Sequence, residues 1–176
     1  MSYTFENISI LVVEDNKPMF ELIKGLLETF GVVDVDGAAN GEDGFQQFCK
    51  KNHDIVLADW MMEPIDGISL TRMIRNEERS PNHFVPIVLI TGFSEKQRVL
   101  EARDAGVTEF LVKPFNARDL YRRIVQIIER PRQFVRSPDF FGPDRRRRVD
   151  HAYNGPKRRI DEVETIEFRD RRGNLF

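Results

Sequence analysis

Short apolar runs recur along the first two thirds of this chain, separated by stretches long enough to hold a helix. Consecutive apolar positions, rather than alternating ones, are typical of parallel strands that are buried on both faces. A weaker run over 33–38 is interrupted by Asp34 and Asp36. The pattern therefore predicts a weak second strand over 33–38 and four clear strands over 8–13, 55–58, 87–90 and 110–112.

Between these runs, apolar residues return at the spacing of helical turns. Ile23, Leu27 and Phe30 follow Pro18, which suits a first helical turn, and Gly31 ends the pattern. Similar patterns predict helices over 41–51, 67–78 and 95–105, and a last helix capped by Asn116 and ended by Pro131. Alternating strands and helices predict a doubly wound α/β domain with helices on both faces of a parallel sheet.

Polar residues stand where the predicted strands end. Glu14 and Asp15 follow the first run, and Asp59, Thr91 and Lys113 follow the three later clear runs. Because the carboxyl ends of the strands form the ligand crevice of a doubly wound sheet, we expect these side chains to meet there. The pocket would hold three carboxylates, one hydroxyl and one ammonium.

The charges in this pocket indicate its chemistry. Two carboxylates about 4 Å apart repel by roughly 4 kcal/mol at an effective dielectric of about 20, unless a cation neutralises them. Oxygen ligands without His or Cys favour Mg²⁺, which also accepts phosphate oxygens. Lys113 and Thr91 would complete a phosphoryl site as a point charge and a hydroxyl donor, which leaves Asp59 as the group to be phosphorylated.

Four segments carry a family resemblance. ILVVEDN (10–16), IVLADWMMEPIDG (55–67), PIVLITG (86–92) and FLVKPF (110–115), at these spacings, resemble the receiver domain of two-component response regulators. The resemblance covers about residues 7 to 130. It implies a flavodoxin-like five-stranded sheet of order 2-1-3-4-5 and Mg²⁺-dependent aspartyl phosphorylation by a histidine kinase or another phosphohistidine protein. It also implies a cis peptide bond between Lys113 and Pro114.

The resemblance assigns a role to each residue of the site. Asp59 is the expected nucleophile and phosphoacceptor, and Lys113 offsets charge on the phosphoryl oxygens. Asp15 would hold Mg²⁺ most directly and Glu14 through water, together with Asp59 and the backbone carbonyl of Met61. Glu14 replaces the commoner Asp of the family and keeps its charge.

The resemblance further implies a conformational switch. Phosphorylation would draw Thr91 towards the new oxygens and open space for Phe110, which occupies the family's aromatic switch position. The interpretation of Phe110 as an ordinary packed aromatic residue stays open. Glu63 stands where receivers often have Pro, with Pro64 after it, and we expect the Glu63 carboxylate to face solvent rather than the metal.

Charge divides the chain into two parts, which we interpret as a receiver domain over 1–130 and a basic extension over 131–176. Residues 131–176 hold twelve Lys or Arg against eight Asp or Glu, whereas residues 1–130 hold fifteen against twenty-one.

Cys49 is the only cysteine, so an internal disulfide is excluded. We find no pattern of a signal peptide or membrane span and expect a cytoplasmic protein.

The extension permits more than one interpretation. Its charge and shortage of aliphatic residues favour a solvated, largely irregular segment. The cluster of Phe134, Phe140 and Phe141 instead suggests an anchor onto the domain or another chain. A weaker apolar set, Val163, Ile166 and Phe168, suggests a strand added to an exposed edge. The run of arginines over 145–148 would suit carboxylates or phosphates.

These observations predict a single-domain response regulator, not an enzyme, that signals through phosphorylation-dependent contact with a downstream protein. Dimerisation is a further possibility for this family. Two alternatives stay open: a nucleic-acid-binding regulator that uses the arginine-rich extension, and a Mg²⁺-dependent phosphohydrolase with Asp59 as nucleophile. Nucleic acid is a minor candidate because the whole chain is slightly acidic, with a net charge of −2.

Overall fold

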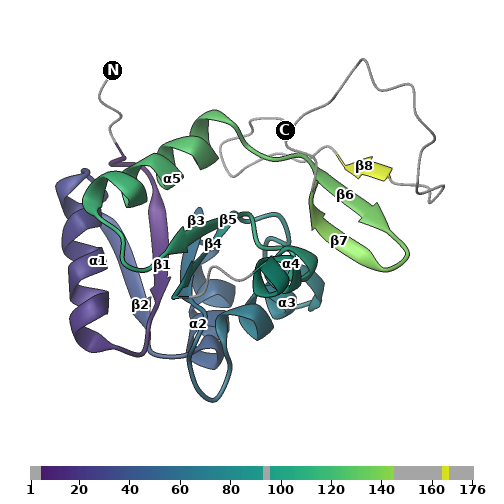
Figure 1. Cartoon of the computed structure of the whole chain (residues 1–176), viewed down its shortest axis with the longest axis horizontal. Helices are drawn as coiled ribbons and strands as arrows, with labels where there is room; N and C mark the ends of the chain where they lie inside the picture. Colours follow the sequence, from purple (N-terminus) through teal and green to yellow (C-terminus); the bar gives the residue numbers. More distant parts are fainter. Residues whose placement is uncertain (1–4, 93–95, 145–163, 167–176) are drawn as a thin grey trace.

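A five-stranded parallel sheet forms the centre of the molecule in the computed structural model, which describes residues 5–92, 96–144 and 164–166 (Figure 1). The strand order is β2-β1-β3-β4-β5, as the sequence predicts for a flavodoxin-like fold. Every residue of β1, β3 and β4 is buried, which explains why their sequences are apolar without alternation. The strands are β1 (Ser9–Val13), β2 (Asp34–Ala38), β3 (Ile55–Asp59), β4 (Ile87–Thr91) and β5 (Glu109–Val112).

Helices cover both faces of the sheet. Helices α1 and α5 pack on one face and share a core with β1 and β3, whereas α2 and α3 pack on the other face. A third, smaller apolar cluster lies beneath α4. The helices are α1 (Lys17–Thr29), α2 (Gly41–Lys51), α3 (Gly67–Asn76), α4 (Lys96–Ala105) and α5 (Ala117–Glu129).

Polar side chains fix where the helices begin. Asn16, Asn40, Asp66 and Asn116 each accept a hydrogen bond from the backbone N–H three residues later. The cap at Asn116 is the one predicted from the sequence, and it forms a reciprocal capping box with Asp119. The capping residues therefore mark where α1, α3 and α5 begin, after the loops that follow β1, β3 and β5.

The third helix and the second strand are shorter than predicted. The third helix ends at Asn76 rather than at residue 78, because Glu77 has extended backbone geometry. The second strand begins at Asp34, and Val33 before it is 75% exposed. Both differences lie at element ends, where local pattern constrains the backbone least.

The extension is not irregular throughout, which corrects the expectation for this region. Strands β6 (Phe134–Ser137) and β7 (Phe140–Pro143) form an antiparallel hairpin, and β8 (Glu164–Ile166) pairs with the other edge of β6. The hairpin contacts α3 and α4 (Figure 1). The aromatic anchor and the added strand are therefore confirmed, whereas the arginine run over 145–148 lies outside the described residues.

Candidate functional site

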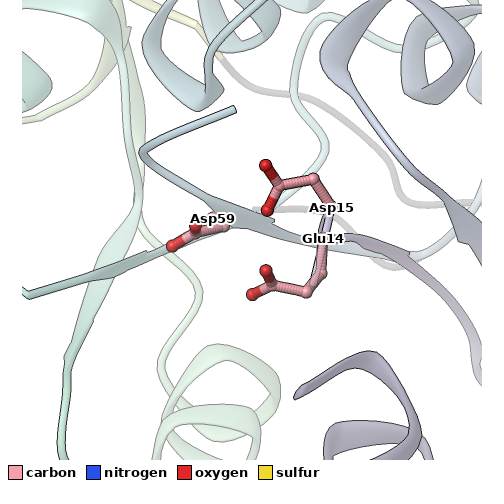
Figure 2. A group of neighbouring side chains, drawn as sticks. All are labelled: Glu14, Asp15 and Asp59. Atoms are coloured by element: carbon pink, nitrogen blue, oxygen red, sulfur yellow. The ribbon is translucent and has the colours of Figure 1, made fainter. Parts of the chain in front are cut away.

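Three carboxylates converge at the carboxyl end of the sheet. Glu14 and Asp15 follow β1, and Asp59 is the last residue of β3. One ligand oxygen from each of the three lies within 4.8 Å of the others. Figure 2 shows the Glu14 and Asp15 side chains extending from one segment towards the side where Asp59 lies. Glu14 and Asp59 are buried and Asp15 is exposed, so the cluster is open to solvent on one side.

Lys113 joins this cluster from the loop after β5. Its ammonium Nζ donates to Asp59 Oδ1 at 2.9 Å and to Glu14 Oε2 at 3.4 Å. The Lys113 backbone N–H donates to the carbonyl of Thr91 at 2.7 Å, which ties the β5 loop to the end of β4. The bond between Lys113 and Pro114 is cis, as predicted, and so is the bond between Glu63 and Pro64.

Burial and mutual repulsion change the protonation equilibria at this site. Desolvation, and secondarily the nearby Asp59 charge, raise the pKa of Glu14, although hydrogen bonds from Asn16 and Lys113 oppose the change. For Lys113, burial acts to lower the pKa, but the hydrogen bond and attraction to Asp59, with Glu14 adding to them, raise it above its ordinary value. Lys113 is therefore held as a cation between two carboxylates.

The Thr91 hydroxyl side chain lies at the end of β4 with only 1% of the residue exposed. Beside it, Gly92 is exposed, and a Cβ added there would meet nothing within 4 Å. Access to the carboxylates from this side is consequently not blocked by a side chain at position 92.

The remaining predicted residues lie around the cluster rather than in it. Met61 follows Asp59 by two residues, and its side chain is exposed. Glu63 is exposed, in agreement with the expectation that it faces solvent. Phe110 is half-buried on β5 and packs against the apolar cluster that contains Trp60. It does not lie among the carboxylates.

Two supporting residues were not singled out by the sequence. The backbone N–H of Asn16 donates to Glu14 Oε1 at 3.0 Å, so the residue that caps α1 also orients a site carboxylate. Gly67 packs against the backbone carbonyl of Asp59 so closely that a Cβ there would overlap it. The sequence shows that Gly67 directly follows the capping residue Asp66, but it does not show that Gly67 lies against the Asp59 carbonyl.

Comparisons with known proteins agree with this geometry. Residues 10–125 match the family model of the response regulator receiver domain. The chain is 33% identical over 123 residues to the chemotaxis protein CheY of Pseudomonas aeruginosa, and the match covers 70% of this chain and 98% of that protein. The chain therefore belongs to the response regulator receiver family, and it is a phosphoacceptor protein of two-component signalling.

Solved structures give the same result. A two-component response regulator from Clostridium difficile superposes with a TM-score of 0.64 at 29% identity, over 70% of this chain and 98% of that one. The receiver domain of a Pseudomonas aeruginosa sensor histidine kinase superposes with a TM-score of 0.60 at 31% identity, over 68% and 94%. That structure has a magnesium ion coordinated in its active site cleft.

The described residues contain no helix that is long and apolar enough to cross a membrane.

Proposed function

We propose that Asp59 is the phosphoacceptor of this receiver and that Lys113, Thr91, Glu14 and Asp15 assist its phosphorylation. The observation that carries the proposal is the position of the Asp59 carboxylate. It lies at the end of the central strand, within 4.8 Å of the other two carboxylates and 2.9 Å from the Lys113 ammonium. Asp59 is buried at the carboxyl end of the sheet, where doubly wound folds bind their ligands, which favours reaction with a group brought to this end.

Magnesium fits the donor set of the site. Three carboxylates whose oxygens lie within 4.8 Å provide hard oxygen ligands, and a divalent cation would relieve the repulsion that raises the pKa of Glu14. Asp15, Glu14, Asp59 and the backbone carbonyl of Met61 are the residues that would hold it. When bound, the ion neutralises charge on the carboxylates and on phosphoryl oxygens.

The phosphoryl transfer follows from the residues present. A carboxylate oxygen of Asp59 attacks the phosphorus of a phosphohistidine, so an O–P bond forms while the P–N bond breaks. The electron pair of the broken bond stays on the donor's imidazole, which takes a proton from water. Lys113 is already within hydrogen-bond distance of Asp59 Oδ1 and offsets negative charge on the transferred group, and Thr91 supplies a hydroxyl at the neighbouring strand end.

The implied partners are proteins. Receiver domains interact with histidine kinases or phosphotransfer proteins, and we infer a donor of this kind for Asp59. The output is a phosphorylation-dependent contact with a downstream protein or with a second copy of the chain. No observation on the described residues favours nucleic-acid binding or hydrolysis of an external phosphate ester.

The proposal is tested by incubating the full chain with acetyl phosphate and Mg²⁺ and measuring its intact mass. We expect a gain of one phosphoryl group that requires Mg²⁺ and is absent in Asp59→Asn. Asp34→Asn, which changes a half-buried aspartate at the start of β2, is the matched control and retains the gain. Phosphorylation of Asp59→Asn to the same extent as the unchanged protein would refute the assignment.

A further inference from the structure

The hairpin of the C-terminal extension is docked on the domain by aromatic rings. Phe134 of β6 is 2% exposed, and its ring centroid lies 5.2 Å from that of Phe84, in the loop before β4. Phe141 of β7 lies 5.4 Å from Phe84 and 5.7 Å from Phe134. Three mutually packed rings form a small core between the hairpin and the domain, so the hairpin is held by burial and not only by the chain connection.

A buried arginine lies under the same hairpin. Arg75, at the end of α3, is 2% exposed, and its guanidinium lies 5.0 Å from the centroid of the Phe134 ring. It donates to the carbonyl of Gly106 at 3.1 Å, to the carbonyl of His83 at 2.7 Å and to the Thr108 hydroxyl at 3.4 Å. Desolvation lowers the pKa of Arg75 to about 9. Arg75 thus links α3, the α4–β5 turn and β6 in one contact.

Strand β7, the second strand of the hairpin, packs closely against the turn that follows α4. A Cβ added to Gly142 of β7 would lie 3.0 Å from the Cα of Gly106 and 2.8 Å from the Phe140 ring. Gly106 has a φ of +99°, a conformation suited to glycine, and it ends α4. The backbones of β7 and of the turn after α4 thus approach closely, so a movement of this turn towards β7 would meet backbone rather than a flexible side chain.

A buried carboxylate connects β5 to the segment that leads into the hairpin. Glu109, the first residue of β5, is 2% exposed. Its carboxylate lies 3.4 Å from Nε of Arg132, 3.5 Å from Nη1 of Arg123 and 3.2 Å from Nε2 of Gln126. Arg132 precedes β6, so the position of the hairpin and the position of β5 are set by the same charged group.

An apolar cluster joins this region to the phosphoacceptor. Trp60, which directly follows Asp59, packs in one cluster with Leu89, Ala105 and Val107, and Phe110 packs against it. Ala105 and Val107 flank Gly106, the residue in contact with β7. The cluster thus runs from the residue after Asp59 to the turn on which the hairpin rests, through side chains that are buried and closely packed.

From this continuity we propose that the β6–β7 hairpin is an intramolecular output element, whose docking on the α3, α4 and β5 ends is energetically coupled to phosphorylation of Asp59. The inference rests on the proposed function and adds its regulation. It also assigns a role to a segment that lies beyond the family match, which ends at residue 125. Thermodynamic linkage then requires reciprocity. If phosphorylation changes the equilibrium constant for hairpin docking by some factor, the equilibrium constant for phosphorylation differs between the docked and the undocked chain by the same factor.

The first test measures hydrogen exchange of the full chain with and without acetyl phosphate and Mg²⁺. We expect phosphorylation to change the exchange rates of the protected amides in β6 and β7 by a factor on the order of five or more. Asp59→Asn under the same conditions shows no change. Intact mass is recorded on each sample. A mass gain at Asp59 with unchanged exchange in the hairpin overturns the inference alone, whereas the absence of a mass gain overturns the proposed function.

The second test weakens the docking of the hairpin and measures phosphorylation of Asp59. Gly142→Ala forces β7 away from Gly106, and Gly25→Ala is the matched control because a Cβ there meets nothing within 4 Å. We expect Gly142→Ala to change the fraction of chain that is phosphorylated at a fixed, limiting concentration of acetyl phosphate, and Gly25→Ala to leave this fraction unchanged. Hydrogen exchange confirms that β1 to β5 stay folded in the variant. If β6 and β7 exchange faster in Gly142→Ala while phosphorylation is unaltered, the coupling does not exist.

Discussion

The two ends of the five-stranded sheet both hold buried charges, but they arrange them differently. At the carboxyl end, three carboxylates lie within 4.8 Å of one another, and the Lys113 ammonium contacts two of them. At the amino end, the Glu109 carboxylate is met by two arginines and a glutamine. Negative charge is thus in excess at one end and matched by donors at the other.

This difference separates a reactive site from a structural contact. Carboxylates kept close together against their repulsion remain available for a cation and for phosphoryl chemistry, because the folded chain supplies too few positive groups. A buried carboxylate surrounded by guanidinium and amide donors is stabilised in place and instead fixes the elements that carry those donors. The same residue types thus contact the docked extension at one end, and we propose that they serve phosphoryl chemistry at the other.

The largest effect is expected from breaking the lysine contact at the carboxyl end. Lys113→Met removes the cation that lies 2.9 Å from Asp59, and we expect phosphorylation by acetyl phosphate to slow by a factor on the order of one hundred. The rate is measured as phosphoryl mass gain against time. Lys24→Met, which removes an exposed ion pair of 3.9 Å with Glu28, is the control and keeps the full rate. An unchanged rate in Lys113→Met would mean that this lysine serves only packing.

A smaller effect is expected from a substitution at the amino end of the sheet, which tests the structural role of that end. Arg75→Lys keeps the positive charge but cannot reach three separate acceptors, so Gly106, His83 and Thr108 lose donors in a buried region. We expect the free energy of unfolding, measured by urea denaturation, to fall by about 1–3 kcal/mol. Arg72→Lys on the exposed side of the same helix should change it by less than about 0.5 kcal/mol. Equal stability of the two variants would contradict the buried contact.

The smallest effect concerns a titratable side chain at the amino end. His53 is fully buried, and its Nε2 lies 2.8 Å from Asp36, which also pairs with Lys51. Desolvation lowers the pKa of His53 although Asp36 opposes the change. The unfolded chain therefore binds the proton more readily, and stability is lost as the pH falls below the unfolded pKa of about 6.5.

We expect this loss to be absent in His53→Gln, whose side-chain amide retains a donor for Asp36 and does not titrate. Between about pH 7.5 and pH 5.5 the unchanged protein should lose more unfolding free energy than the variant. Urea denaturation at both pH values measures the difference. If both proteins show the same pH dependence, His53 is not the group responsible.

The sequence predicted the carboxyl end of the sheet in detail. Apolar runs mark the buried strands, and parallel strands bring their ends together whatever the lengths of the connections. The pattern alone therefore predicts Asp15, Asp59 and Lys113 in one site, where the structure has them. The resemblance added the cis bond before Pro114. The individual roles of these residues remain predictions until the variants above are measured.

The amino end was predicted less completely. The phenylalanines around residue 140 indicated an anchor, but not the surface it binds, because the contact of Phe134 with Phe84 and Arg75 depends on tertiary packing between distant segments. Arginine is usually exposed, so its helical position gave no sign that Arg75 is buried. The close approach of Gly142 to Gly106 likewise depends on two backbones that no local pattern relates.

The position of Asp59 within the carboxylate cluster makes it the proposed phosphoacceptor. Borohydride reduction of the phosphorylated full chain converts an aspartyl phosphate to homoserine, and peptide sequencing by mass spectrometry then locates it. The account predicts homoserine at position 59 and at no other aspartate. Homoserine at Asp15, or a phosphorylated chain with Asp59 intact, would contradict it.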